Sequence, residues 1–266
     1  PKQLPNSFEP NPIKAAKTVT TSVPKIYNSW LKLGLGNYST AFAEFNISNL
    51  HSKEYSYGAY FRHKSSQARI LLNNNKKANS RYVENNIQVY GKRFFPRVTL
   101  SGNIKFDQKG FNYYGYNTDN FPATPDVGKD SLKQRVYKPG LELGLKSNTT
   151  KPGDLNYSIT GSADYFTDKL KNKEPRWMLQ TSFSKEVSGF LGGLDLKVDY
   201  SKIKNDMDTT DNTIVIFNPW ISKSSDDWSF RLGFQAVADA SDITKYYFYP
   251  QAHLDIIIVK DVLIPF

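Results

Sequence analysis

The sequence has no cysteine, and this absence excludes disulfide bonds, thiolate metal sites and thiol catalysis. It also has no run of about eighteen apolar residues, so it cannot cross a membrane as a helix. The mean hydropathy is −0.55, but such an average does not exclude a membrane protein. The wall of a transmembrane β-barrel is apolar only at every second position, and the polar positions between them cancel the signal.

Motifs of the common catalytic sites are also missing. The sequence contains no Gly-x-Ser-x-Gly segment, no Walker loop and no dinucleotide-binding fingerprint. We therefore predict that the protein is not an enzyme, that it has no catalytic residues and that it binds no cofactor. The net charge is +10, but the lysines are scattered through loops and polar strand faces, so we expect no nucleic-acid partner.

Alternation of apolar and polar residues is the dominant feature of the chain. In the segment 156–165 one series of side chains is apolar or small, namely Tyr157, Ile159, Gly161, Ala163 and Tyr165, and the other is polar. A strand sends successive side chains to opposite faces, and segments 98–106, 194–200 and 228–236 repeat the alternation. Strands of about ten residues with one apolar face predict an all-β, antiparallel up-and-down transmembrane β-barrel.

Twelve strands are expected in the wall. They cover about residues 30–37, 41–48, 55–62, 87–94, 98–116, 133–147, 155–167, 176–187, 193–204, 213–223, 227–238 and 244–258. The segment 98–116 could also be a hairpin that turns at 107–110. We favour a single strand, because it places all the long connections on one rim of the barrel, as this fold requires. These connections are 65–81, 117–132, 167–175, 204–212 and 239–243, and we expect them to be extracellular, with the short turns periplasmic.

The two ends of the chain differ from the wall. Residues 1–28 contain five prolines, and proline favours extended chain outside a ladder, so we expect a Pro-rich periplasmic lead-in before a wall at 29–266. The chain does not begin with Met and has no signal-peptide core at its start, so we expect a processed chain or a fragment. Residues 262–266 reach at most about 18 Å, too short for a tilted strand. Because an open edge in lipid leaves unpaired backbone groups, either twelve strands close the barrel or the chain is part of a larger one, and we expect the larger barrel.

Several strand-and-turn segments are similar to a known family. They are residues 33–38 (LGLGNY), 49–58 (NLHSKEYSYG), 61–66 (FRHKSS), 113–117 (YYGYN) and 259–266 (VKDVLIPF). Over about residues 26–266 the chain resembles the TonB-dependent-receptor-like outer-membrane barrels of Bacteroidota. The resemblance implies an outer-membrane barrel with strands beyond Phe266. A plug domain and a TonB box are not recognisable, so the chain also fits an accessory subunit of a machine for envelope protein export or assembly.

Few residues are candidates for binding a metal ion. His51 is expected in a turn, and His63 and His253 on distant strands, so we expect ordinary turn and wall histidines instead of convergent ligands. The segment 205–211 has carboxylates at alternating positions that can gather around Ca²⁺. It lacks the glycine and the terminal glutamate of an EF-hand loop, so we expect a solvated hairpin tip and no metal site.

Two triplets match the O-glycosylation pattern of the same bacterial group. They are Asp130-Ser131-Leu132 and Asp208-Thr209-Thr210, and both are expected at the rim of long loops. Chance occurrence explains triplets this short equally well.

Aromatic residues are expected near both ends of the strands. Those near the short turns are Trp30, Tyr55, Tyr57 and Trp228, and those near the long loops are Tyr113, Tyr114, Trp177, Tyr200, Tyr246 and Tyr247. Two bands of amphipathic rings are typical of the levels where a barrel wall meets lipid headgroups.

We therefore predict a non-catalytic integral outer-membrane protein that acts in transport or in an envelope export or assembly machine. Its expected partners are outer-membrane lipid, lipopolysaccharide and other envelope proteins. The predicted lumen face carries Lys32, Glu44, Arg62, Lys105, Asp164, Lys197 and Asp199. The alternatives are a TonB-coupled nutrient importer whose plug lies outside this chain, and a soluble β-sandwich that binds glycan or protein. In a sandwich, the row of Leu194, Leu196 and Val198 would face a second sheet.

Overall fold

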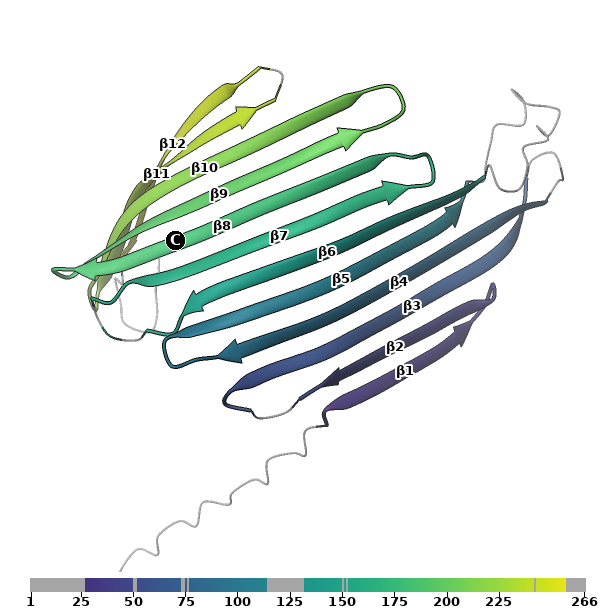
Figure 1. Ribbon diagram of the computed structural model, residues 1–266, viewed down its shortest axis with the longest axis horizontal. Helices are drawn as coiled ribbons and strands as arrows, with labels where there is room; N and C mark the ends of the chain where they lie inside the picture. The colour runs from purple at the N-terminus through teal and green to yellow at the C-terminus, as the bar shows by residue number, and fades with distance from the viewer. Residues whose placement is uncertain are drawn as a thin grey trace, which may run out of the picture.

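The computed structural model describes residues 27–49, 52–72, 75, 77–113, 132–149, 151, 153–241 and 243–256. These residues form one antiparallel sheet in which twelve strands follow each other in sequence order, without a helix (Figure 1). The strands are β1 (Ser29–Gly36), β2 (Thr40–Ser48), β3 (Tyr55–Leu71), β4 (Lys77–Phe94), β5 (Val98–Asn112), β6 (Lys133–Ser147), β7 (Asn156–Asp168), β8 (Lys173–Val187), β9 (Phe190–Lys204), β10 (Thr209–Ser224), β11 (Trp228–Ala240) and β12 (Lys245–Ile256). The predicted fold class, an all-β antiparallel up-and-down barrel wall, is confirmed.

The register carries the alternation of each strand across the whole sheet. Leu143 on β6 pairs with Gly161 on β7, Gly161 with Leu179 on β8, and Leu179 with Val198 on β9. Directly paired residues point to the same face of a sheet, so the apolar series of neighbouring strands form one continuous surface. None of the described residues belongs to a helix with the length and hydrophobicity that a membrane crossing requires.

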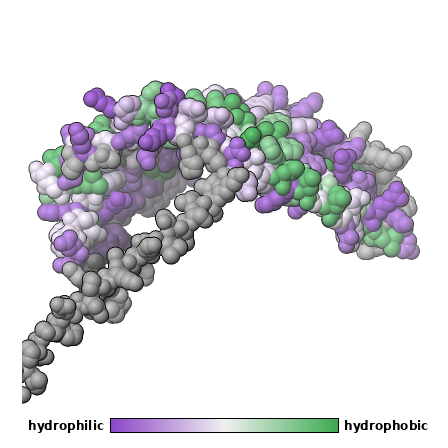
Figure 2. Space-filling model, turned by 90° about the horizontal axis from the view of Figure 1, so that it is seen from below, coloured by the Kyte–Doolittle hydropathy of each residue, from purple (hydrophilic) through white to green (hydrophobic). Residues whose placement is uncertain are grey.

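The sheet is strongly curved. Figure 2 shows it as an arch, with green hydrophobic residues among purple hydrophilic ones along the convex side and mainly hydrophilic residues in the visible part of the hollow. We call these two surfaces the convex face and the hollow face. The curvature explains a difference in exposure, because side chains spread apart on the outside of an arch and converge on its inside. Leu33 on the convex face is 74% exposed, whereas the carboxylate side chain of Asp199 on the hollow face is 10% exposed.

Hydrophobic side chains do not form a core in the described part of the chain, because none of them is buried there. A soluble sandwich requires a second layer packed on the apolar face, but the described strands all belong to one sheet. The row of Leu194, Leu196 and Val198 therefore faces no second sheet within the described residues. The alternative of a soluble β-sandwich is wrong for this part of the chain.

The choice of one long strand in the segment 98–116 is confirmed as far as Asn112. Asp107, at the expected hairpin turn, pairs with Asn86 on β4 and with Lys138 on β6. It therefore lies in the middle of β5 with a ladder on each side. Residues 114–116 lie outside the described residues.

The predicted loop at 65–81 is wrong. β3 continues to Leu71 and β4 begins at Lys77, with Gln67 paired to Arg81. Polar residues on both faces suggested a loop, but ladder hydrogen bonds form irrespective of side-chain polarity. The connections expected at 167–175 and 204–212 are likewise shorter, since the flanking strands reach residues 168, 173, 204 and 209.

The two ends of the sheet are not joined to each other. β1 and β12 occupy opposite edges, and among the described strands each has one neighbour. The Pro-rich lead-in lies outside the described residues except for residues 27 and 28, and so do residues 257–266, which include the expected stub.

Candidate functional site

The hollow face collects the charged residues that the sequence predicts for a lumen. Lys32, Glu44 and Arg62 form one register row across β1, β2 and β3. Lys32 Nζ lies 3.6 Å from Glu44 Oε2, and the hydroxyl of Tyr60 donates to Glu44 Oε1 at 2.7 Å. Glu44 is thus held by partners from both neighbouring strands.

Five charged side chains of alternating sign cross the hollow face from β5 to β9, and we call them the charge ladder: Lys105, Asp164, Arg176, Asp199 and Lys197. Lys105 Nζ lies 3.1 Å from Asp164 Oδ1, and Asp164 is the register partner of Arg176. Arg176 Nε donates to Asp199 Oδ1 at 2.8 Å, and its Nη2 donates to Asp199 Oδ2. Lys197 Nζ lies 3.5 Å from the same carboxylate. The paired geometry holds these charges in a surface that faces the hollow.

Arg176 was not among the predicted lumen residues. It stands between Pro175 and Trp177 at the start of the predicted strand, where few polar residues alternate with apolar ones. The alternation therefore did not mark Arg176 as a lumen residue. The sequence did contain an indication: Arg176 is separated from Met178 and Gln180 by even numbers of positions, so the three side chains point to the same face of β8. Its two bonds to Asp199 appear only when β8 and β9 are aligned.

Asp195 is a second polar centre on the hollow face. It accepts hydrogen bonds from Ser182 Oγ at 2.6 Å, from Asn218 Nδ2 at 3.3 Å and from the indole Nε1 of Trp220 at 3.0 Å. The guanidinium of Arg231 lies 4.2 Å from the centre of the Trp220 ring, a cation–π distance. The carboxylate therefore accepts three hydrogen bonds from the two neighbouring strands, β8 and β10, and Trp220 is fixed inside the hollow.

Neither the described histidines nor the candidate calcium loop forms a cluster of metal ligands. His63 Nδ1 lies 2.6 Å from Asn85 Oδ1, and on β12 His253 Nε2 lies 3.0 Å from Asp255 Oδ1, whereas His51 lies outside the described residues. In the segment 205–211, Asn205 Oδ1 accepts hydrogen bonds from the backbone N–H groups of residues 207 and 208, and these bonds close the β9–β10 turn. Among the described residues, no group of three or more His, Cys, Asp or Glu can hold a metal ion.

The candidate glycosylation triplets remain predictions. Asp208, Thr209 and Thr210 are exposed at the start of β10. Of the other triplet, residues 130 and 131 lie outside the described residues.

The predicted aromatic bands need correction. Trp30 pairs with Asn46, and Tyr247 pairs with Val237. By the alternation along their strands, both residues belong to the hollow face, and so does Tyr113. Tyr114 lies outside the described residues. The error arose because the prediction considered the distance of a ring from the strand end but not the side to which it points.

Aromatic residues on the convex face still gather at both ends of the strands. Tyr55 stacks with Tyr57 at 5.9 Å and Trp228 with Phe230 at 5.8 Å between ring centres, near the short turns. At the other rim the convex face carries Trp177, Tyr200 and Tyr246. Trp177 pairs with Ala163, Tyr200 with Trp177, and Tyr246 with Ala238, which places all three rings on the convex face.

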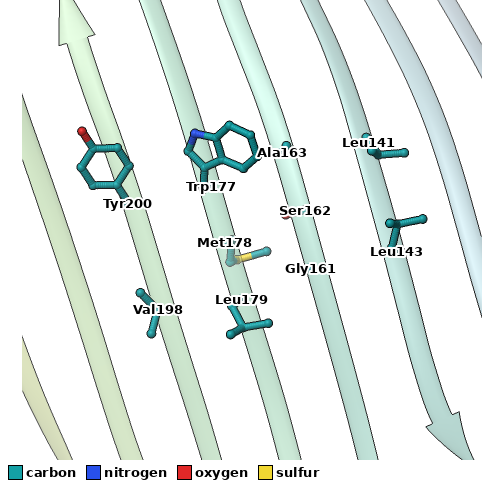
Figure 3. A pocket seen from close by; sticks show the side chains of 10 residues that line it. All are labelled: Leu141, Leu143, Gly161, Ser162, Ala163, Trp177, Met178, Leu179, Val198 and Tyr200. Atoms are coloured by element: carbon teal, nitrogen blue, oxygen red, sulfur yellow. The ribbon is translucent and has the colours of Figure 1, made fainter.

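The convex face has an apolar depression over β6 to β9, which we call the β6–β9 groove (Figure 3). Its floor is β7, where Gly161 and Ala163 present almost no side chain. Leu143 and Leu179 are the register partners of Gly161 and flank it on either side. The lining also includes Leu141, Ser162, Trp177, Met178, Val198 and Tyr200. The sequence showed the small residues on β7, but the groove depends on what the neighbouring strands place beside them.

Comparison with known proteins gives few matches. No protein-family model matches the sequence, and no curated protein does. Among solved structures, the chain is similar to LpxR from Salmonella typhimurium, with 10% sequence identity and a TM-score of 0.30 over 82% of this chain and 88% of LpxR. A likeness with so low a TM-score carries no argument about activity or substrate. The resemblance to TonB-dependent-receptor-like barrels of Bacteroidota stays a prediction.

One prediction is corrected by this comparison. We predicted from the missing motifs that the protein is not an enzyme, but LpxR, an outer-membrane β-barrel, is an enzyme. The absence of motifs therefore does not exclude catalysis, and we withdraw the prediction. The reasoning failed because catalytic groups in a barrel come from several strands, so no short motif needs to mark them.

Proposed function

We propose that the chain forms the membrane-spanning wall of an outer-membrane β-barrel that transports polar solutes through its lumen. The observation that carries the proposal is the convex face, where large apolar side chains are exposed while no hydrophobic side chain is buried in the described residues. Each Leu, Ile or Phe left in water forgoes about 1.5–3 kcal/mol of burial free energy. A surface of many such residues is stable only against hydrocarbon, and sheets enter hydrocarbon as barrels.

The unjoined edges support a wall that continues beyond the described strands. In a bilayer the outer edges of β1 and β12 would leave backbone N–H and C=O groups without partners, which costs several kcal/mol for each group. We therefore propose that strands other than these twelve pair with both edges, and that the wall closes around a lumen larger than twelve strands enclose.

The orientation that we propose places the β3–β4 end outside the cell. Outer-membrane barrels have short periplasmic turns and longer extracellular elements. The β8–β9 connection consists of Ser188 and Gly189 alone, which suits the periplasmic rim. At the opposite rim, β3 and β4 extend to Leu71 and Lys77, and β5 is joined to β6 by residues 113–132.

The hollow face supports a role in transport. Its charge ladder places Asp164 and Asp199 between three cations, with side chains that are 14% and 10% exposed. Charges held in fixed positions along a water-filled passage set the selectivity of barrel channels.

A planar-bilayer recording of the purified full-length protein tests this function. We expect insertion from detergent, a steady ionic conductance in KCl, and a lower cation-to-anion permeability ratio in the Asp164→Asn/Asp199→Asn double variant. The matched control is Asp211→Asn, which should leave the ratio unchanged. Asp211 is an exposed residue of β10 on the convex face, outside the lumen. A protein that stays in the aqueous fraction without detergent would contradict the membrane location, and one that inserts without conductance would contradict transport.

A further inference from the structure

Three lysines lie beside the aromatic end of the β6–β9 groove, and we call them the lysine cluster: Lys173, Lys202 and Lys204. Lys202 and Lys204 follow Tyr200 on β9 with the same parity, and Lys173 precedes Trp177 on β8 with the same parity. Residues of one parity point to one face of a strand, so the cluster belongs to the convex face. At about 3.3 Å per residue, its members begin within about 13 Å of the aromatic residues along the strands.

The cluster has unbalanced positive charge. Lys173 is the direct register partner of Lys204, and like charges in this position repel and destabilise the strand pair. Within the described part of the chain, none of the three amino groups lies within 4.0 Å of a carboxylate. Asp211 is the register partner of Lys202 but forms no ion pair with it. An external anion would relieve this repulsion.

The groove has the opposite chemistry and has room for a ligand. A Cβ atom added to Gly161 would meet no atom within 4 Å, so the floor is open above the backbone. The walls on either side are Leu143 and Leu179, and Figure 3 shows their side chains on the strands that flank β7. A narrow apolar channel along a strand fits an extended hydrocarbon chain.

The order of the chemistry along the strands is that of a membrane lipid. The apolar groove comes first, Trp177 and Tyr200 follow, and the lysine cluster lies at the rim beyond them. Amphipathic aromatic rings occupy the headgroup level of a bilayer, which places the groove at the depth of acyl chains and the lysines at the depth of phosphates. Phosphate groups are strong acceptors for lysine.

We propose that this surface binds one anionic lipid, with its phosphate-bearing headgroup on the lysine cluster and an acyl chain in the β6–β9 groove. The inference rests on the proposed function, because it requires the convex face to lie in a bilayer. The charge selects an anionic headgroup, and the neighbouring groove selects a lipid over a soluble anion. A bilayer supplies such a ligand at the correct depth without a separate protein partner.

Fluorescence quenching at Trp177 tests the proposal. The full-length protein is placed in phosphatidylcholine vesicles that contain a small fraction of phosphatidic acid with brominated acyl chains, which quench a nearby indole. The signal of Trp177 is the difference between the wild type and the Trp177→Phe variant. We expect stronger quenching by brominated phosphatidic acid than by brominated phosphatidylcholine at the same fraction.

Two variants separate the headgroup site from the acyl-chain site. Lys173→Gln/Lys204→Gln should weaken the preference for phosphatidic acid about fivefold for each lysine removed. Gly161→Val should reduce quenching by filling the groove, and the space above this glycine means that the fold tolerates it. The matched controls, which should keep the wild-type quenching, are Lys185→Gln at the opposite end of β8 and Gly91→Val on the convex face of β4.

Each remaining outcome decides the question. Equal quenching by the two brominated lipids in the inserted wild-type protein would overturn the proposal. It would also be overturned if millimolar inorganic phosphate removed the excess quenching, because the cluster would then be a site for a free anion. If the wild-type protein does not sediment with the vesicles, the proposed function itself fails, and this result is read before any quenching.

Discussion

At the scale of single residues, the hollow face depends on glycines that make room for large side chains. A Cβ atom at Gly193 would collide with the indole ring of Trp220. The ring lies across this glycine and reaches Asp195, to which it donates a hydrogen bond of 3.0 Å. The position of Trp220 therefore depends on the absence of a side chain on the neighbouring strand.

We expect Gly193→Val to destabilise the protein by about 1–3 kcal/mol, because an added side chain in a filled position forces its neighbours to move. Denaturant unfolding in lipid vesicles, followed by tryptophan fluorescence, measures the change. The control is Gly161→Val, the same substitution at a glycine with open space, which should change the free energy of unfolding little. Equal effects of the two substitutions would show that Trp220 does not occupy the space over Gly193.

The residues of the hollow face show how far alternation reaches. Lys32, Glu44 and Asp199 were predicted to share one face, and the register confirms it. Trp220 and Arg176 were missed, because their importance comes from partners on other strands. The sequence indicates to which face of the sheet a side chain points, but it does not indicate which residue of the neighbouring strand lies beside it.

At the scale of strands, β3 and β4 have two parts with different surroundings. On the convex parity of β3, Phe61 is followed by His63, Ser65 and Gln67, so the apolar band ends while the ladder continues. Leu71 lies at the far end of this extension. The proposed membrane boundary thus crosses the middle of β3, and the rest of the hairpin stands in solvent.

Leucines with the same exposure should respond differently to a charge. Leu143 is 58% exposed within the apolar band and Leu71 is 60% exposed at the tip of β3. We expect Leu143→Arg to cost about 2–4 kcal/mol, as for an arginine at the midplane of a bilayer, and Leu71→Arg to cost about 0–1 kcal/mol. Reversible unfolding in vesicles measures both. Similar costs for the two variants would mean that hydrocarbon does not surround Leu143.

At the scale of the whole molecule, the open sheet raises the question of its neighbours. Each strand from β2 to β11 is paired on both sides, whereas β1 and β12 each have one free edge within the described residues. Exposed edges of long strands promote aggregation in water and are unsatisfied in lipid. The proposal that further strands cover both edges therefore predicts that β1 and β12 do not meet.

Engineered disulfides test this arrangement, and the sequence has no native cysteine to interfere. Leu232→Cys/Ala252→Cys joins register partners on β11 and β12 and should form a disulfide, because partner Cα atoms lie within bonding range. Leu33→Cys combined with cysteine at Phe248, Pro250 or Ala252 should form none. Non-reducing electrophoresis of the membrane-inserted protein gives the answer, and a β1–β12 disulfide would show that twelve strands close the barrel.

The sequence by itself determined the fold class, the single long strand through Asp107 and the polar nature of the hollow face. These features follow from a period of two residues, which any strand expresses through its own backbone. It misplaced the strand ends at 65–81, because polar residues on both faces do not prevent a ladder from forming.

The tertiary structure alone decided what lies across the strands. It placed Arg176 on Asp199, Trp220 over Gly193 and the lysine cluster beside the groove, because contacts between residues far apart in sequence depend on register and curvature. Register is fixed only when strands pair, and it is this pairing that turns alternating residues into surfaces with distinct chemistry.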